Sequence, residues 1–580
     1  MHLKKAHLFA LLGISLLNLN HPYADAQSYT TRPPHGWQLM DFATDNVYGA
    51  EVNKAYQELL KGKKSHPVIV AVIDGGLDTA QEDLRGHIWI NPGEIPNNGI
   101  DDDHNGYVDD VHGWNFIGGK NGKNIIDESS EADREYARLE PIFGSITDSN
   151  QIKRKLRPEY RYWLKLKAKR EADSADNAET YANLSRVLTV FHQVDSILQH
   201  ALHRDTITEQ SLTSFEPEDS ASAWALNIAY RIFDRIGNDA SLESYIAEGD
   251  DYLHQTEQKL KALHEDPNAR RREIVGDNPF DIHDRDYGNN NVAAGNPMHG
   301  THVAGIIAAT RGNGIGMDGI ADNVIIMPVR VVPDGDERDK DVALGIRYAV
   351  DNGAQIINMS FGKPYSPQKK WVDKAVKYAE RKGVLLVHAA GNESSDDDTV
   401  PNYPNADFLN SHKRAWNFIN VGASTAGPDS LIVASFSNYG KKEVDLFAPG
   451  EDIYSTVTHN QYASYSGTSM ASPMVTGVAA LILEYYPHLT ARQLKYVIEH
   501  SVTTLPGDSV YIPGTDQKTL FANLSRTGGL LNAYQALKLA STLHGKRKIT
   551  KREEDRLQRI VAMIKGQQGR SPDDAAPSGE

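Results

Sequence analysis

Short, continuous apolar segments alternate with segments of helical periodicity in two parts of the chain. The first apolar segment, residues 67–73 (PVIVAVI), is rich in β-branched side chains, as expected for a parallel strand buried on both faces. Similar segments occur at residues 324–332, 354–359, 384–390, 418–423, 431–435 and 443–447. Residues 342–352, between two of them, have helical spacing. This alternation predicts an α/β fold of three layers, with a mostly parallel central sheet covered by helices on both faces.

Between these two parts the pattern changes. Residues 128–272 are rich in Lys, Arg, Glu, Asp and Ala and show little β-branched patterning. Apolar residues recur there at helical spacing, for example Leu184, Leu188 and Leu198. The sequence therefore predicts an inserted α-helical subdomain, and we interpret the charged residues 153–169 as a solvated face. The subdomain is also a candidate binding surface for a protein partner.

The start of the chain has the layout of a secretory signal peptide. Lys4 and Lys5 precede an apolar segment, residues 8–19, and Ala24-Asp25-Ala26 follows it. The apolar segment is shorter than the ~20 residues that a membrane-spanning helix needs. We therefore expect cleavage after Ala26, no transmembrane anchor in the mature chain, and a secreted, periplasmic or cell-envelope location in a bacterium.

These observations predict an order of segments along the chain. They are a signal peptide (1–26), an N-terminal lead-in (27–66), a first part of the α/β domain (67–127), the helical insertion (128–287), a second part of the α/β domain (288–543) and a charged, largely disordered tail (544–580). The disorder is predicted from the Gly, Pro, Ser and Asp content of residues 566–580.

Composition excludes several classes of function. The 580 residues include no cysteine, so disulfide bonds and a cysteine nucleophile are both excluded. Export without disulfides is compatible with a bacterial envelope or growth medium. The formal net charge of −16 argues against nucleic acid as a partner. No pattern in the sequence indicates an organic cofactor.

Residues 464–477 (SYSGTSMASPMVTG) join a tight turn to a buried helix. Gly467 permits the turn, and the small polar residues Thr468 and Ser469 favour a helix N-terminus. The unpaired N–H groups of such an N-terminus can hold the oxyanion that forms when a serine attacks a carbonyl group. The alternative is a structural capping serine, which would be favoured for an isolated serine in this context.

Asp74 and His299, like Ser469, lie next to glycines at the end of a predicted strand or the start of a predicted helix. Asp74 follows the first predicted strand and precedes two glycines. Open α/β sheets bind ligands at this end of a strand, although a lone aspartate there could equally cap a turn. His299 and His302 begin an apolar helix. Two histidines at this spacing could bind zinc, but the glutamate of an HExxH motif is missing. We therefore interpret one histidine as functional and the other as a packed structural residue.

Residues 97–115 (NNGIDDDHNGYVDDVHGWN) resemble a calcium loop, because oxygen ligands alternate around Gly106. The candidate ligands are Asp101, Asp103, Asn105, Asp109 and Asp110. The match to an EF-hand is incomplete, since His112 stands where the twelfth-position glutamate would be. A solvated acidic turn is the alternative. Structural calcium is favoured because so many uncompensated carboxylates would repel one another.

Three stretches together resemble the motifs of the subtilisin-like serine proteases (subtilases). They are AVIDGGLD around Asp74, HGTHVAGIIAA from His299 and GTSMASPMVTG around Ser469, and their order is that of subtilisin. The resemblance covers residues 67–115 and 288–540 and leaves out the insertion, which separates the first two motifs unusually far. It implies a subtilisin-like fold and a serine endopeptidase acting on polypeptides.

The resemblance also implies roles for individual residues. Ser469 would be the nucleophile, His299 the general base, Asp74 the residue that orients the imidazole, and Asn392 in HAAGNES a donor to the oxyanion. Substrate-binding positions would be Ser360, Phe361, Gly362, Ala389, Ala390, Gly391 and the segment that begins at Gly335. Asp83 and Asn313 match positions of a calcium site found in many subtilases.

Two other functions remain as alternatives. An esterase of the α/β-hydrolase type would need a G-x-S-x-G motif, but Ala471 replaces the second glycine, and the order of the three residues would differ. A catalytically silent subtilase-like protein would bind peptides at the sheet edge, and its insertion would recruit a partner. The presence of all four catalytic side chains argues against it.

Overall fold

The computed structural model describes residues 33–568, apart from residues 147, 149, 151, 237–240, 264, 428 and 506. The predicted signal peptide lies outside the described residues, as does the end of the predicted tail from residue 569. Within the described part, residues 132–267 form one compact unit, and the remaining residues form a larger one. No helix in the described ranges is both long and apolar enough to cross a membrane.

The larger unit is built on a nine-stranded sheet with the order β10-β13-β7-β6-β5-β4-β1-β3-β2. Its strands are β1 (Val68–Asp74), β2 (Trp114–Asn115), β3 (Val324–Arg330), β4 (Ile356–Met359), β5 (Leu385–Ala389), β6 (Phe418–Ser424), β7 (Leu446–Pro449), β10 (Thr503–Thr504) and β13 (Gly529–Leu530). All neighbouring pairs are parallel except β10 and β13, which are antiparallel. The predicted mostly parallel sheet is confirmed.

Strand β1 shows how the sheet separates two apolar cores. Val68, Val70 and Val72 belong to one core, whereas Ile69 and Ile73 belong to the other, because successive side chains of a strand point to opposite faces. Every residue of β1 is buried, which explains its continuous apolar sequence.

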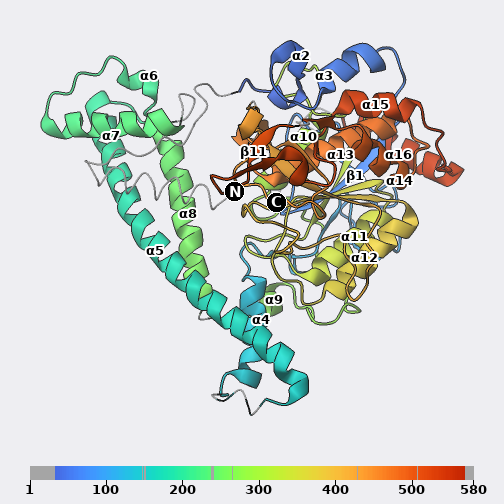
Figure 1. Cartoon of the computed structure of the whole chain (residues 1–580), viewed down its shortest axis with the longest axis horizontal. Coiled ribbons are helices and arrows are strands. Elements are labelled where there is room, and N and C mark those ends of the chain that lie inside the picture. The colour runs from blue at the N-terminus through green and yellow to red at the C-terminus, as the bar shows by residue number, and fades with distance from the viewer. Residues whose placement is uncertain are drawn as a thin grey trace. The chain divides into compact units, whose positions relative to one another are not determined.

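Helices cover both faces (Figure 1). The first core is completed by α3 (Val52–Ala55), α10 (Met298–Ala308), α13 (Thr468–Tyr485), α14 (Ala491–His500) and α15 (Ala533–Ser541). The second is completed by α11 (Asp339–Asp351), α12 (Lys369–Lys382) and α16 (Lys551–Gln568). The three-layer α/β architecture is therefore as the sequence predicts.

Shorter elements connect these layers in the larger unit. They are α2 (Phe42–Asp45), α9 (Ala269–Ile274), the β-hairpin of β8 (Ile453–Val457) and β9 (Gln461–Tyr465), the pair β11 (Ser509–Tyr511) and β12 (Lys518–Leu520), the π-helix η2 (Tyr56–Leu60) and the 3₁₀-helices η1 (Trp37–Leu39), η5 (Asp429–Leu431) and η6 (Phe521–Asn523).

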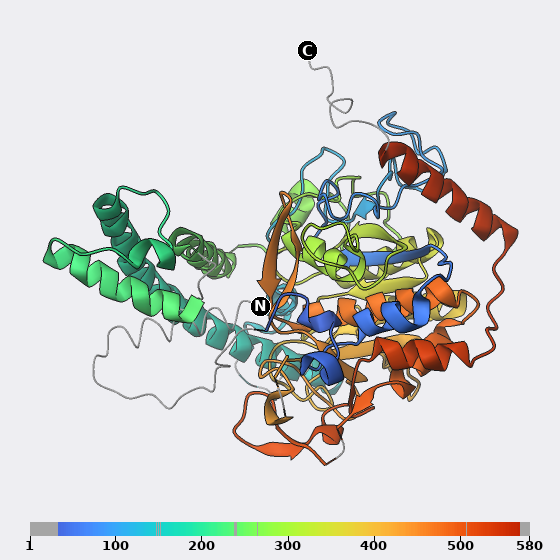
Figure 2. The same cartoon turned by 90° about the horizontal axis from the view of Figure 1, so that it is seen from above.

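Two segments of the larger unit differ from the predictions. Residues 431–435 do not form a strand, although Ile432 and Val433 are buried; they lie in a separate small core and make only an isolated bridge to Ser424. The charged tail, for which disorder is predicted from residue 566, forms the helix α16 (Lys551–Gln568), seen as the dark red helix in Figure 2, so this helix includes the first residues of the predicted disordered part. Ile560 and Ile564 bury its apolar face in the second core.

The smaller unit is helical, as predicted. It contains α4 (Glu131–Phe143), η4 (Arg154–Leu156), α5 (Arg157–Leu202), α6 (Glu209–Leu212), α7 (Ser220–Ile236) and α8 (Leu242–Ala262). Leu188, Phe191 and Leu198 of α5 pack with Phe233 and Ile246 in a core of its own. Residues 128–131 and 268–287, which the predicted insertion includes, lie in the larger unit.

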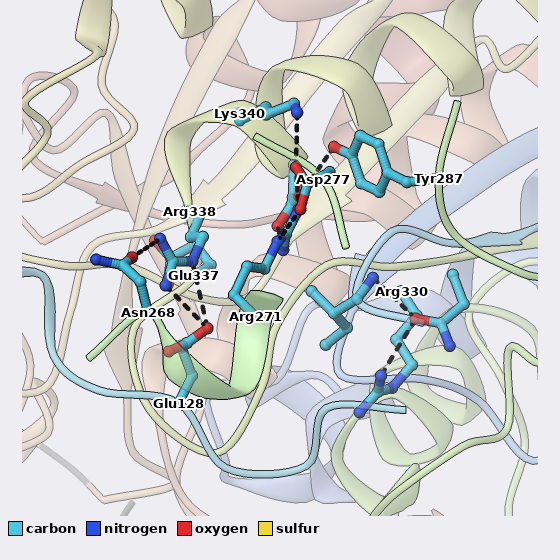
Figure 3. Close-up of polar contacts among 12 residues, drawn as sticks. Glu128, Asn268, Arg271, Asp277, Tyr287, Arg330, Glu337, Arg338 and Lys340 are labelled. Carbon is cyan, nitrogen blue, oxygen red and sulfur yellow. Dashed lines mark hydrogen bonds and ion pairs between the residues drawn. The ribbon is translucent and has the colours of Figure 1, made fainter. Parts of the chain in front are cut away.

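A network of buried charges holds those boundary residues (Figure 3). The Arg271 guanidinium forms ion pairs with Asp277 and Asp341 at 2.5 and 2.6 Å, and Lys340 contacts Asp277 at 2.6 Å. The Tyr287 hydroxyl donates to Asp341 at 2.7 Å. The charged side chains of these ion pairs are fully buried. The returning end of the insertion is thereby fixed to the start of α11.

Arg338 connects both ends of the insertion. Its guanidinium contacts the Glu128 carboxylate at 3.1 Å and donates to the Asn268 side chain at 2.9 Å (Figure 3). Glu128 precedes the smaller unit in the chain and Asn268 follows it directly. The points where the chain leaves and re-enters the larger unit are therefore held by one side chain.

Candidate active site

The end of β1 and the start of α10 bring Asp74 and His299 together. His299 Nδ1 donates to Asp74 Oδ1 at 2.8 Å, and the Gly75 N–H donates to the same oxygen at 2.7 Å. Asp74 is buried, and its Oδ2 has no hydrogen-bond partner among the described residues. The buried carboxylate therefore fixes the ring orientation and leaves Nε2 as the imidazole's free nitrogen.

Glycines allow the start of α10 to lie close to the end of β1. A Cβ atom on Gly300 would lie 2.0 Å from the Gly76 carbonyl oxygen and 3.2 Å from Asp74 Cβ. Gly76 itself has a φ of +125°, which side-chain-bearing residues rarely adopt. The glycines flanking both motifs are therefore required for α10 to begin next to the end of β1.

The two histidines of α10 have different polar partners, and their pKa values shift in opposite directions. Burial lowers the pKa of His299, but the charge of Asp74 and its hydrogen bond outweigh this effect, so the pKa lies above 6.5. His302 is buried, donates from Nε2 to the Ala463 carbonyl at 3.0 Å and stacks on Tyr465. Burial lowers the pKa of His302 to about 3. Among the described residues neither histidine belongs to a group that could hold a metal ion.

Ser469 is the second residue of α13 and is half-buried. Its hydroxyl donates to the Ser360 carbonyl at 3.0 Å, and the Ser360 hydroxyl donates in turn to the Ser469 carbonyl at 2.9 Å. Ser360 directly follows β4, the neighbour of β1 in the sheet. In this resting arrangement the Ser469 hydroxyl is bonded to Ser360 rather than to His299. Catalytic hydrogen bonds of this kind commonly form only when substrate is bound.

Asn392 lies after β5, opposite the start of α13. Its Oδ1 accepts from the Thr468 N–H at 2.8 Å and from the Thr468 hydroxyl at 3.0 Å, which fixes the side-chain amide. The position of a Cβ atom on Gly467 would be 3.6 Å from both Asn392 Nδ2 and the Ser469 backbone nitrogen. These two N–H donors therefore border the same space, which Gly467 leaves open.

The predicted substrate-binding residues lie at the ends of adjacent strands. Ser360, Phe361 and Gly362 follow β4, whereas Ala389, Ala390 and Gly391 end or follow β5. Asn402, which the sequence analysis did not single out, contacts both the segment after β4 and the segment after β5. Its Nδ2 donates to the Ala390 carbonyl at 2.7 Å, and its Oδ1 lies 2.6 Å from the position of a Cβ atom on Gly362.

Gly335 follows a residue whose backbone is hydrogen-bonded to the segment 126–128. The Asp334 N–H donates to the Ile126 carbonyl at 2.7 Å, and the Glu128 N–H donates to the Asp334 carbonyl at 2.9 Å. Gly335 has a φ of +134°, and a Cβ atom there would lie 2.1 Å from the Glu128 carbonyl oxygen. One side of this predicted substrate segment is therefore occupied by residues just before the insertion.

The predicted calcium ligands do not all come together. Asp101 and Asp103 lie in one group with Glu94, which the sequence analysis did not include. Asp109 instead accepts from the backbone of residues 98 and 99, and Asp110 accepts from Asn91, Asn105 and Tyr348. Elsewhere, Asn313 Nδ2 donates to the buried Asp83 carboxylate at 2.6 Å.

Comparisons with known proteins identify the family. The profile of the subtilase family matches residues 65–527. The chain is 38% identical over 237 residues to a thermophilic serine proteinase of Bacillus sp. (strain AK1), a match that covers 40% of this chain and about half (52%) of that protein. It is 41% identical over 217 residues to subtilisin DY of Bacillus licheniformis, covering 37% of this chain and 73% of that protein.

One solved structure also matches part of the chain. The crystal structure of a cold adapted subtilisin-like serine proteinase is 33% identical, covers 42% of this chain and 78% of that chain, and has a TM-score of 0.33. The family profile spans most of the sequence, including all three motifs around Asp74, His299 and Ser469. The chain therefore belongs to the subtilase family.

Proposed function

We propose that this subtilase is an exported serine endopeptidase that hydrolyses peptide bonds through an acyl-enzyme on Ser469. The observation that carries the proposal is the 2.8 Å hydrogen bond between Asp74 and His299 in a subtilase whose serine begins a helix. Export is supported by the signal-peptide layout of residues 1–26.

The geometry assigns a role to each group. After Ser469 turns from the Ser360 carbonyl, His299 Nε2 takes the proton of its hydroxyl while Oγ attacks the scissile carbonyl carbon. Asp74 stabilises the imidazolium that results. The same imidazolium then protonates the leaving amine, and a water molecule, activated in the same way, hydrolyses the acyl-enzyme.

The oxyanion needs donors that are already in place. The Asn392 amide and the Ser469 backbone N–H border one open space, so both can bind the developing negative charge without reorganisation. The N-terminal end of α13 adds its positive dipole to this site. We infer that this arrangement provides most of the electrostatic stabilisation of the transition state.

A labelling experiment tests the proposal. The chain lacking residues 1–26 is incubated with denatured casein, with and without a serine-directed fluorophosphonate, and the labelled peptide is identified by mass spectrometry. We expect casein cleavage, inhibition by the fluorophosphonate, and the label on Ser469. A folded sample that neither cleaves casein nor takes up the label would instead support the catalytically silent peptide-binding alternative.

Removing the proposed oxyanion donor should slow turnover with little effect on substrate binding. We expect Asn392→Ala to lower kcat by about 10²–10³-fold, the loss that subtilisin shows when one such donor is removed. Thr468→Val is the matched control, because it deletes a hydroxyl bonded to Asn392 but leaves the amide donor in place. If both variants lost activity equally, orientation of Asn392 and not its donor would be the cause.

The activity should depend on the protonation of His299, which must be neutral to act as a base. Because the pKa of His299 lies above 6.5, we expect kcat/KM to rise with pH and to reach half its plateau above pH 6.5. Asp74→Asn should lower that midpoint, since it removes the charge that raises the pKa, and should reduce kcat by about 10⁴-fold. A midpoint unchanged in Asp74→Asn would assign the titration to another group.

A further inference from the structure

The loop between β1 and β2 brings together three carboxylates that the catalytic mechanism does not use. One oxygen atom from each of Glu94, Asp101 and Asp103 lies within 4.8 Å of the other two. Such a spacing is typical of ligands around a single cation, whereas carboxylates without one repel each other.

Glu94 is the unusual member of the group. Its side chain is only 5% exposed, and Oε1 accepts from the Asp103 N–H at 3.1 Å. Its Oε2 is buried and has no hydrogen-bond partner among the described residues. A buried carboxylate oxygen is normally paired, because leaving it without a partner forfeits the hydration it had in water. Glu94 therefore brings a buried carboxylate oxygen without a protein partner among the described residues to this acidic group.

The carboxylates of this loop lack close cationic partners among the described residues, although Arg556 lies near enough to interact with Asp103 and Asp110 over a longer distance. The loop also carries Asp102, Asp109 and Asp110, so six carboxylates lie between residues 94 and 110. Within the part of the chain that the structure describes, no lysine or arginine forms an ion pair with any of the six. A bound cation would supply the missing positive charge.

Hydrogen bonds hold two of the carboxylates in position. Asp101 accepts from the Asn105 N–H at 3.0 Å and from the Gly106 N–H at 2.8 Å. Asp103 Oδ2 accepts from Asn91 Nδ2 at 3.0 Å. Each carboxylate oxygen keeps a second lone pair for a ligand. These hydrogen bonds fix the orientation of both carboxylates within the loop.

We propose that Glu94, Asp101 and Asp103 bind one calcium ion that stabilises this loop. All three ligands are carboxylate oxygens, the donors that calcium prefers, and histidine and cysteine are absent from the group. Asp103 is exposed, so water can complete the six to eight ligands that calcium takes. Magnesium demands a stricter octahedral geometry and should bind more weakly.

Calorimetry on the full mature chain tests the site, with Ser469→Ala in the background to prevent autolysis. The protein is freed of metal with a chelator and titrated with calcium chloride alone or magnesium chloride alone. We expect Glu94→Gln and Asp103→Asn each to weaken one calcium-binding event at least about tenfold, and calcium to lose most of its effect on the thermal unfolding temperature.

Asp102→Asn is the matched control. It removes a carboxylate from the same loop, but Asp102 accepts from the Ile95 N–H and Asn98 Nδ2 and is not one of the three grouped ligands. Calcium binding within about threefold of the parent in this variant supports the site. If Asp102→Asn weakened calcium binding equally, the effect would come from the total charge of the loop, and the proposal would be overturned.

Other outcomes also decide the question. Calcium binding that survives Glu94→Gln but is lost in Asp83→Asn would move the ion to the Asp83–Asn313 contact and overturn the proposal. The absence of any calcium binding would do the same. If Glu94→Gln does not fold, the exposed Asp103→Asn still gives the answer, because its side chain lies at the surface. None of these readouts requires peptidase activity.

Discussion

Replacing Ser469 with alanine should reduce kcat by about 10⁶-fold, the loss that subtilisin suffers when its nucleophile is removed. Within the described ranges the Ser469 hydroxyl donates one hydrogen bond, to the Ser360 carbonyl, so its loss should leave the fold and KM almost unchanged. The measurement is steady-state hydrolysis of a chromogenic peptide, accompanied by thermal unfolding of both proteins.

The control for this expectation is Ser466→Ala, three residues earlier in the chain. Ser466 accepts from the Asp452 N–H through its hydroxyl and should be dispensable for the chemistry. We expect its activity to stay within a few-fold of the parent. Equal hydrolysis by Ser469→Ala and the parent would show that a contaminant or another residue is responsible.

Replacing Arg271 with alanine should destabilise the protein by about 3–5 kcal/mol, because it leaves the buried Asp341 carboxylate without its counter-ion and Asp277 with Lys340 alone. Asp277 and Asp341 both contact the Arg271 guanidinium, and all three side chains are fully buried. Lys340 can neutralise Asp277 but forms no ion pair with Asp341 among the described residues. The measurement is the urea concentration at the unfolding midpoint, taken in the Ser469→Ala background.

The adjacent Arg270 provides a matched control. Its guanidinium contacts Asp127 at 3.4 Å, but the two side chains are 43% and 39% exposed. An exposed ion pair contributes about 0–1 kcal/mol, so Arg270→Ala should leave the midpoint nearly unchanged. A midpoint for Arg271→Ala equal to that for Arg270→Ala would mean that solvent or a shift of the chain compensates the buried carboxylates.

The parts of the fold that the sequence predicts well are those set by local pattern. Strand β1 reads as a strand because burial on both faces demands continuous apolar residues. Ile432 and Val433 are buried as well, yet they pack in a small core beside the sheet, and their segment makes only an isolated bridge to it. Burial is visible in a sequence, but the partner of a buried segment is not.

The same limit applies to charged residues. Asp74, His299 and Ser469 were found because each lies in a motif with glycines that the geometry requires. Glu94 and Asn402 carry no such signal, since their roles depend on a loop folding back and on a contact between two strand ends. The ion pairs of Arg271 likewise appear only when the chain after the insertion meets α11.

The single guanidinium of Arg338 that holds Glu128 and Asn268 has a consequence for how this chain diversifies. Because the exit and re-entry points are neighbours, a segment between them can be gained, shortened or exchanged with little loop-closure cost and no change in strand register. The helical unit is thus a module in the topological sense. A change in its length or sequence would leave the strand order of the larger unit as it is.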